Sequence, residues 1–214
     1  TQANSIAGTL KNDSLLAACY QSFGSCYFWK GDKIMSLRNY FEAKNIAERI
    51  KNEQLIRVCN SSLINFFSSI KNYDKAVDFA YNNLANSRES KTKDFQYYII
   101  SDLYAIGNIY NQQKKFDLAK SFYEQSIAKA DSLKIAISKF QSYVGIFNMY
   151  LTSDQPQKAL AYLNDHPELK KAFIDVGYAG TLDYAFAYAY IEFNKLDSAE
   201  YYIKKALPFY ENQV

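Results

Sequence analysis

Asparagines recur at one position of a repeating pattern in this chain. Asn65, Asn108 and Asn148 are spaced by 43 and 40 residues, and each lies two positions before an aromatic residue. An asparagine amide both donates and accepts hydrogen bonds, so a row of such amides can bind the backbone of an extended polypeptide without selecting its side chains. If the aromatic residues face inward between helices, the asparagines project outward. The same position holds Ser25 earlier in the chain and Tyr188 later.

The sequence shows no comparable pattern of catalytic or metal-binding residues. His166 is the only histidine, and it lies beside Pro167 at an expected helix boundary, where a solvated or capping role is the simplest interpretation. The seven glycines are dispersed and form no phosphate-binding loop. Acidic residues are scattered over expected helix exteriors. We therefore expect no catalytic residue, no metal site, no cofactor and no enzymatic activity.

The cysteines, the charge distribution and the hydropathy indicate which further kinds of site are not expected. Cys19, Cys26 and Cys59 lack metal-ligand spacing and are expected to be buried small hydrophobes, with a disulfide or redox pair as the alternative. The net charge of +3 comes from interspersed basic and acidic residues, so no nucleic-acid binding is expected. The most apolar window, residues 184–193, is about half of the ~20 residues that a membrane span needs. We expect no membrane contact by this segment.

The elements that position these residues follow from an internal repeat. An aromatic residue is followed nine residues later by a small one, at intervals of 40 to 43 residues: Tyr27 with Ser36, Phe67 with Ala76, Tyr110 with Ala119, Tyr150 with Ala159, and Tyr190 with Ala199. Each repeat has apolar residues three and four positions apart, then a short polar turn, then the same pattern again. The small residues let a second helix approach the first closely.

The pattern predicts an all-α chain of about five helical hairpins. The expected helices are 13–29 with 34–51, 54–70 with 74–89, 94–112 with 116–130, 134–152 with 155–165, and 180–194 with 196–212, with a further helix at 168–177 begun by Pro167. The repeat units are about 13–51, 54–89, 94–130, 134–178 and 180–213. Residues 1–12 match the tail of a preceding unit, and both ends of the chain look cut.

These repeats resemble the tetratricopeptide family. The stretch from Leu103 through Gly107 and Tyr110 to Tyr123 matches the family signature almost throughout, whereas the spacing of about forty residues exceeds the usual roughly 34. The resemblance implies a single solenoid domain over residues 1–214. It also implies a right-handed superhelix whose first helices line a concave groove.

The family also informs the groove residues. Asparagines in this register often hold a peptide backbone in the family, but they are also common in repeats with no known ligand. Its chaperone-binding members clamp a terminal carboxylate with lysines one turn earlier, where this chain has Ser61, Tyr104 and Val144. The groove is instead expected to be aromatic and apolar, with Tyr104, Val144, Leu151, Tyr184, Tyr188 and Ile191. Tyr188 and Ile191 could equally pack against a sixth unit. Trp29 is expected to pack within or between repeats, with partner contact as the alternative.

The sequence thus predicts a protein- or peptide-binding module. The candidate partner-binding residues are Asn65, Asn108, Asn148, Tyr104, Tyr184 and Tyr188, and the partner is a protein or extended peptide. The style of the repeats resembles the sensory region of Bacteroidetes-type membrane-anchored regulators, which implies a periplasmic location. The alternatives are a cytoplasmic receptor for a small signalling peptide and a scaffold that self-associates through its end units.

Overall fold

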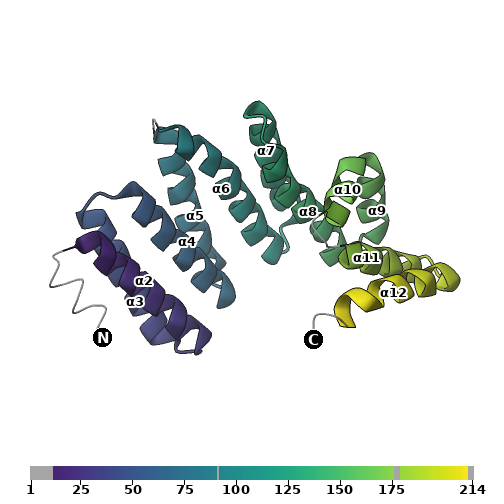
Figure 1. Cartoon of the computed structure of the whole chain (residues 1–214), viewed down its shortest axis with the longest axis horizontal. Coiled ribbons are helices and arrows are strands. Elements are labelled where there is room, and N and C mark those ends of the chain that lie inside the picture. The colour runs from purple at the N-terminus through teal and green to yellow at the C-terminus, as the bar shows by residue number, and fades with distance from the viewer. Residues whose placement is uncertain (1–11, 91, 176–178, 212–214) are drawn as a thin grey trace. The chain divides into compact units, whose positions relative to one another are not determined.

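The computed structural model describes residues 12–90, 92–175 and 179–211, and these residues form helices joined by short turns (Figure 1). The described helices are α2 (Asp13–Trp29), α3 (Lys33–Arg49), α4 (Glu53–Ser69), α5 (Tyr73–Glu89), α6 (Lys93–Gln112), α7 (Phe116–Ser132), α8 (Ala136–Thr152), α9 (Pro156–Asp165), α10 (Pro167–Asp175), α11 (Ala179–Glu192) and α12 (Leu196–Glu211). The all-α prediction is confirmed, and the predicted helix limits agree within about two residues. The expected tail of a preceding unit lies outside the described residues.

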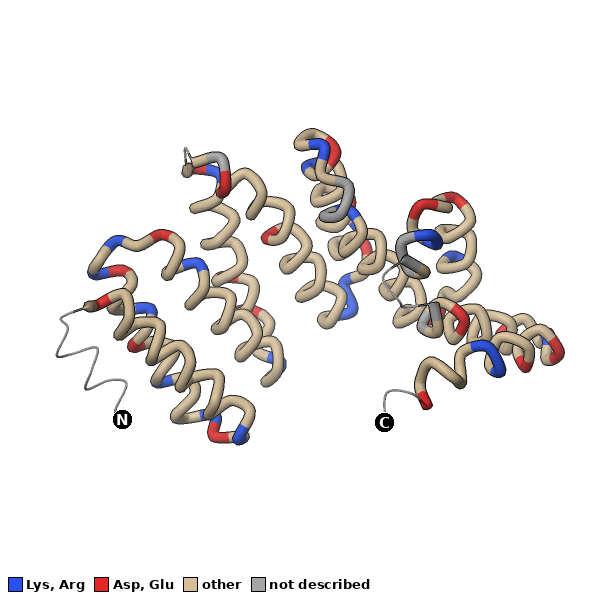
Figure 2. Tube along the Cα trace, in the orientation of Figure 1, with Lys and Arg blue, Asp and Glu red and all other residues tan. Residues whose placement is uncertain are grey.

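The chain divides into two compact units, Thr1–Ile109 (unit 1) and Tyr110–Val214 (unit 2). In unit 1, α2 pairs with α3 and α4 pairs with α5, and the two hairpins pack side by side (Figure 1). In unit 2, α7 packs on α8 and α11 on α12, with α9 and α10 against α8 and α11. Lys and Arg are interspersed with Asp and Glu over both units (Figure 2). The single solenoid domain and its right-handed superhelix stay predictions.

Side-chain caps explain where helices α2 to α5 begin. The side chains of Asn12, Asp32, Asn52 and Asn72 each accept a hydrogen bond from the backbone N–H three residues further on. Such a cap satisfies one of the N–H groups that the first turn of a helix leaves without a partner. Because these caps recur every twenty residues, α2 to α5 begin at the same interval.

The turns after α2, α3, α4, α6, α7, α8 and α11 each contain a residue of left-handed conformation. These residues are Gly31, Lys51, Lys71, Lys114, Lys134, Asp154 and Asn194. The N–H of the next residue returns to a carbonyl five positions before it, as in Asn52 to Ala47 and Asn72 to Phe67. This closure satisfies the last carbonyls of the helix and reverses the chain within two or three residues.

Aromatic rings fill the space between the hairpins of unit 1. The Phe66 ring, 2% exposed, lies 6.2 Å from Phe28 and 6.4 Å from Tyr40 of the preceding hairpin, and 5.4 Å from Phe67. Ala43 and Ala47 of α3 pack against Cys59 of α4. The small residues expected at close helix approaches, Ala76, Ala119, Ala159 and Ala199, are all at most 2% exposed. That prediction is confirmed.

The core of unit 2 includes a short helix between two hairpins. Leu169 of α10, at 1% exposure, packs with Phe147, Ala159, Leu163, Leu182 and Ala185. Pro167 is the first residue of α10, a position where its missing N–H costs no hydrogen bond. The predicted extra helix therefore forms and belongs to the core.

Two predictions about packing in the first hairpin are wrong. Cys26 is exposed and Cys19 half-buried, and only Cys59 is buried. Cys26 occupies the position that Phe66 has one repeat later, and among the described residues no hairpin lies in front of it as α2–α3 lies in front of Phe66. Trp29 is 85% exposed, although Phe28 next to it contacts Phe66 of α4. The described cysteines form no disulfide.

A glycine allows α3 to approach α2 closely. A Cβ on Gly24 would lie 2.4 Å from Cδ1 of the Tyr40 ring, which is 4% exposed. We expect Gly24→Ala to lower the free energy of unfolding by about 1–3 kcal/mol through overpacking, although the better helix propensity of alanine offsets up to about 1 kcal/mol. Thermal denaturation measures this. Ser22→Ala, at an exposed position of the same helix, should change stability by less than about 0.5 kcal/mol. Equal stability of the two variants would contradict the close approach.

Candidate functional site

The predicted residues of unit 1 lie on two neighbouring first helices. Asn65 on α4 is exposed, and Ser61, one turn before it, is exposed as well. On α6, Tyr104 and Asn108 are half-buried and lie one turn apart. The buried asparagines of unit 1 serve the fold, since Asn60 donates to Asn83 at 2.9 Å in the interior and Asn39 donates to the Met35 carbonyl. The exposed amide of Asn65 differs from these and is accessible to a partner.

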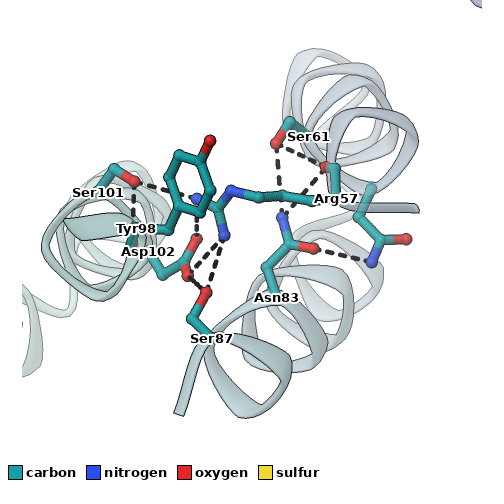
Figure 3. A network of polar contacts seen from close by, with 8 residues as sticks. Arg57, Ser61, Asn83, Ser87, Tyr98, Ser101 and Asp102 are labelled. Carbon is teal, nitrogen blue, oxygen red and sulfur yellow. Dashed lines mark hydrogen bonds and ion pairs between the residues drawn. The ribbon is translucent and has the colours of Figure 1, made fainter. Parts of the chain in front are cut away.

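A buried ion pair joins the helices that carry these residues. The guanidinium of Arg57 on α4 lies 2.7 and 2.8 Å from the two carboxylate oxygens of Asp102 on α6 (Figure 3). The two side chains are 12% and 4% exposed. The Ser87 hydroxyl of α5 donates to Asp102 at 2.7 Å and accepts from Arg57 at 3.0 Å. Three helices of unit 1 therefore share one bidentate, hydrogen-bonded charge pair.

Further contacts surround the Arg57 guanidinium and fix its orientation. It lies 4.1 Å from the centre of the Tyr98 ring and donates to Ser101 at 3.0 Å (Figure 3). A buried pair of this kind is geometrically demanding, because each charge needs its full set of partners once it has left water. The network thus fixes the register of α4 against α6, and with it the spacing of the first-helix surface.

Sequence reasoning missed this network, although a signal was present. Arg57 interrupts the apolar run from Leu55 to Cys59, and Asp102 interrupts the run from Ile99 to Ile106. Opposite charges within apolar stretches of successive first helices suggest a buried pair, since an unpaired charge there would be too costly.

In unit 2 the predicted residues have different surroundings. Asn148 on α8 is exposed, like Asn65. Val144 and Leu151 pack against the core of unit 2, so they offer only part of their surface. The Tyr188 hydroxyl on α11 donates to Asp154 at 3.0 Å, in the turn between α8 and α9. This hydrogen bond to a carboxylate raises the pKa of Tyr188.

Tyr184, one turn before Tyr188, faces another neighbour. Its side chain is 57% exposed, and its ring stands edge-on to Tyr210 of α12 at 6.3 Å. Both rings line an apolar hollow of about 490 Å³ with Ile203, Ala206 and Leu207. The structure therefore does not bring Tyr184 and Tyr188 into one trough with shared contacts: Tyr188 binds the preceding turn and Tyr184 borders α12.

The hollow lies at a repeat position that is buried in the earlier hairpins. Ile203 is 41% exposed, whereas the residues at its repeat position are at most 4% exposed: Tyr40, Ala80, Tyr123 and Leu163. This face of α12 is an exposed apolar surface beside the first-helix positions.

The remaining reactive groups have packing roles. The His166 ring lies between Tyr143 and Tyr162, at centroid distances of 4.8 and 4.5 Å, at the end of α9. Burial raises the pKa of the Tyr162 hydroxyl and raises the pKa of the Cys59 thiol to about 11, so both stay protonated at neutral pH. In the described residues no group of three His, Cys, Asp or Glu side chains could hold a metal ion. Nor is any helix in this part of the chain long and apolar enough to cross a bilayer.

No family model and no curated protein matches the sequence. The structure is similar to BtubC (BKLC) from P. vanneervenii, with a TM-score of 0.76, 15% identity, and coverage of 99% of this chain and 87% of that one. It also matches a signal-transduction ATPase with numerous domains that carries a tetratricopeptide repeat sensor, from Pyrococcus horikoshii. That match has a TM-score of 0.74 and 16% identity, and it covers 94% of this chain and 31% of the other. The fold is that of tetratricopeptide-like repeats.

A third match is a Rap protein in complex with competence and sporulation factor. The TM-score is 0.59 with 12% identity, and the match covers 98% of this chain and 73% of the Rap protein. At these identities the similarity establishes the fold alone, and function has to be argued from the site.

Proposed function

We propose that this chain is a non-catalytic module that binds a protein or an extended peptide through the first helices of its hairpins. The observation that carries the proposal is the exposure of Asn65 and Asn148, which occupy the same repeat position in two different units. An exposed asparagine amide can donate to a C=O and accept from an N–H of an extended backbone, so each of the two units offers such a contact of its own. Tyr104, Asn108, Tyr184 and Tyr188 would add side-chain contacts nearby.

The similar structures support this proposal by analogy. The Rap protein of this fold was crystallised with a bound factor, and the Pyrococcus horikoshii protein uses its repeats as a sensor. We infer a sensory or interaction region of a larger bacterial regulator, periplasmic and membrane-anchored. The second candidate is a cytoplasmic receptor for a small signalling peptide, which the Rap complex favours. A self-associating scaffold is the third, favoured by the apolar face of α12.

Replacing either exposed asparagine, Asn65 or Asn148, with alanine should weaken peptide binding without changing helicity. Peptides selected from a random displayed library on the intact chain would serve as the probe. Each lost amide leaves a peptide backbone group unpaired at a cost of about 1–3 kcal/mol, so Asn65→Ala or Asn148→Ala should each raise Kd about 5- to 150-fold. Fluorescence anisotropy with labelled peptides measures the change.

Asn82→Ala provides the matched control, because Asn82 is also exposed but lies on the second helix α5. It should bind the selected peptides with unchanged affinity. If Asn65→Ala, Asn148→Ala and Asn82→Ala all bind like the original chain, the first-helix surface is not the binding site.

A further inference from the structure

Two large apolar residues project from the turn between α2 and α3. Trp29, the last residue of α2, is 85% exposed, and Ile34, the second residue of α3, is 82% exposed. Among the exposed apolar side chains of the described residues these two have the largest exposed fractions. The Trp29 ring touches Phe28 edge-on at 5.8 Å. Most of the Trp29 side chain therefore faces solvent.

The other hairpins have polar residues at both positions. Counting from the aromatic and small residues that define the repeat, Trp29 corresponds to Ser69, Gln112, Thr152 and Glu192, and Ile34 corresponds to Asp74, Asp117, Gln157 and Asp197. All eight of these residues are exposed. Exposure at these positions is thus a property of the hairpin, and hairpin packing does not require an apolar side chain there.

The charges beside the two side chains indicate what they could contact. Lys30 and Lys33 are both exposed and flank the turn, whereas the carboxylate of Asp32 accepts a hydrogen bond from the Met35 N–H as the cap of α3. The neighbouring turn of unit 1, between α4 and α5, presents two exposed lysines, Lys71 and Lys75, and one exposed carboxylate, Asp74, so lysines outnumber carboxylates at the two turns. A tryptophan and an aliphatic residue beside lysines form an amphipathic tip.

We propose that the α2–α3 turn is a peripheral contact site for an anionic lipid surface. Trp29 and Ile34 enter the interfacial layer of the bilayer, where tryptophan is favoured, and Lys30 and Lys33 lie at the phosphate headgroups. A stable protein interface buries about 800 Å² per partner, more than two side chains at a convex turn provide, and a bilayer requires no complementary shape. This peripheral contact needs no spanning helix, and it departs from the expectation above that this segment makes no membrane contact. It is independent of the peptide-binding proposal.

The sole tryptophan makes the site directly observable. Trp29 emission of the full chain should shift to shorter wavelength on adding vesicles of phosphatidylcholine mixed with phosphatidylglycerol, and should shift little with phosphatidylcholine alone. Ile34→Asp should reduce the shift while keeping the reporter. In co-sedimentation, Trp29→Ser with Ile34→Asp should lower binding to the anionic vesicles by about tenfold, because binding scales with the apolar area inserted. These substitutions introduce the residues that α4–α5 has at the same positions, Ser69 and Asp74, so the fold should be retained.

Tyr201→Ser is the matched control, since Tyr201 is 58% exposed on α12 and should not affect vesicle binding. Lys30→Gln with Lys33→Gln should abolish the preference for anionic vesicles. The proposal is overturned if neither vesicle shifts the emission or if the double variant sediments like the original chain. A shift of the Trp29 emission that grows with protein concentration in the absence of lipid would also overturn the proposal. It would assign the turn to a contact between protein molecules.

Discussion

Asp102→Ala should lower the free energy of unfolding of unit 1 by about 3–5 kcal/mol, because it leaves the Arg57 guanidinium buried without its counter-charge. The Arg57 side chain is only 12% exposed, and Ser87, Ser101 and Tyr98 around it supply no negative charge. Chemical denaturation followed by circular dichroism measures the loss. Hydrogen exchange should rise in α4, α5 and α6, the helices that the network joins, and much less in α11 and α12.

Two further variants distinguish the cost of an unpaired buried charge from the general effect of removing a carboxylate. Asp78→Ala removes an exposed carboxylate from α5 and should change stability by less than about 0.5 kcal/mol. Replacing the pair together, as Arg57→Met with Asp102→Leu, should recover most of the stability, because apolar residues of similar volume avoid the desolvation cost. A loss below about 1 kcal/mol in Asp102→Ala would mean that water reaches Arg57 and that the network does not hold the helices in register.

The fold could be predicted because its signals are local. The nine-residue step from an aromatic to a small residue marks each hairpin, and the Asn and Asp caps mark helix starts at positions such as Asn52 and Asn72. Each hairpin buries its apolar side mainly against its sequence neighbours, so a periodic sequence specifies a serial stack. Departures from the periodicity, such as the short helix α10, were visible through Pro167.

The candidate site was less predictable because it depends on partners far apart in the sequence. Arg57 and Asp102 are 45 residues apart, and periodicity alone places neither against the other. Tyr184 and Tyr188 share a helix face, but whether each ring meets α12 or the α8–α9 turn depends on tertiary packing. For Trp29, the error came from assigning a large apolar residue to the core, when the four polar residues at its repeat position already indicated an exposed site. Comparison between repeats is therefore more informative here than residue type.

Phe66→Ala should also destabilise unit 1 by about 3–5 kcal/mol, through a cavity between its two hairpins. The ring is 2% exposed and contacts Phe28 of α2, Tyr40 of α3 and Phe67 of its own helix. These rings are themselves held by the caps and turns of their helices, so the site can collapse only in part. Thermal denaturation measures the loss, and Phe66→Leu, which retains most of the volume, should cost clearly less.

Phe41→Ala is the control for losing an aromatic ring in the same unit. Phe41 of α3 also meets a ring of the next hairpin, Phe79 at 6.4 Å, but it is 37% exposed, so less apolar area returns to water on truncation. The ratio of the two losses therefore tests whether stability resides at the buried centre of the hairpin interface or is spread along its edge. Equal losses would show that Phe66 does not anchor α4 on the preceding hairpin. The packing of Ala43 and Ala47 of α3 on Cys59 of α4 would then hold that contact instead.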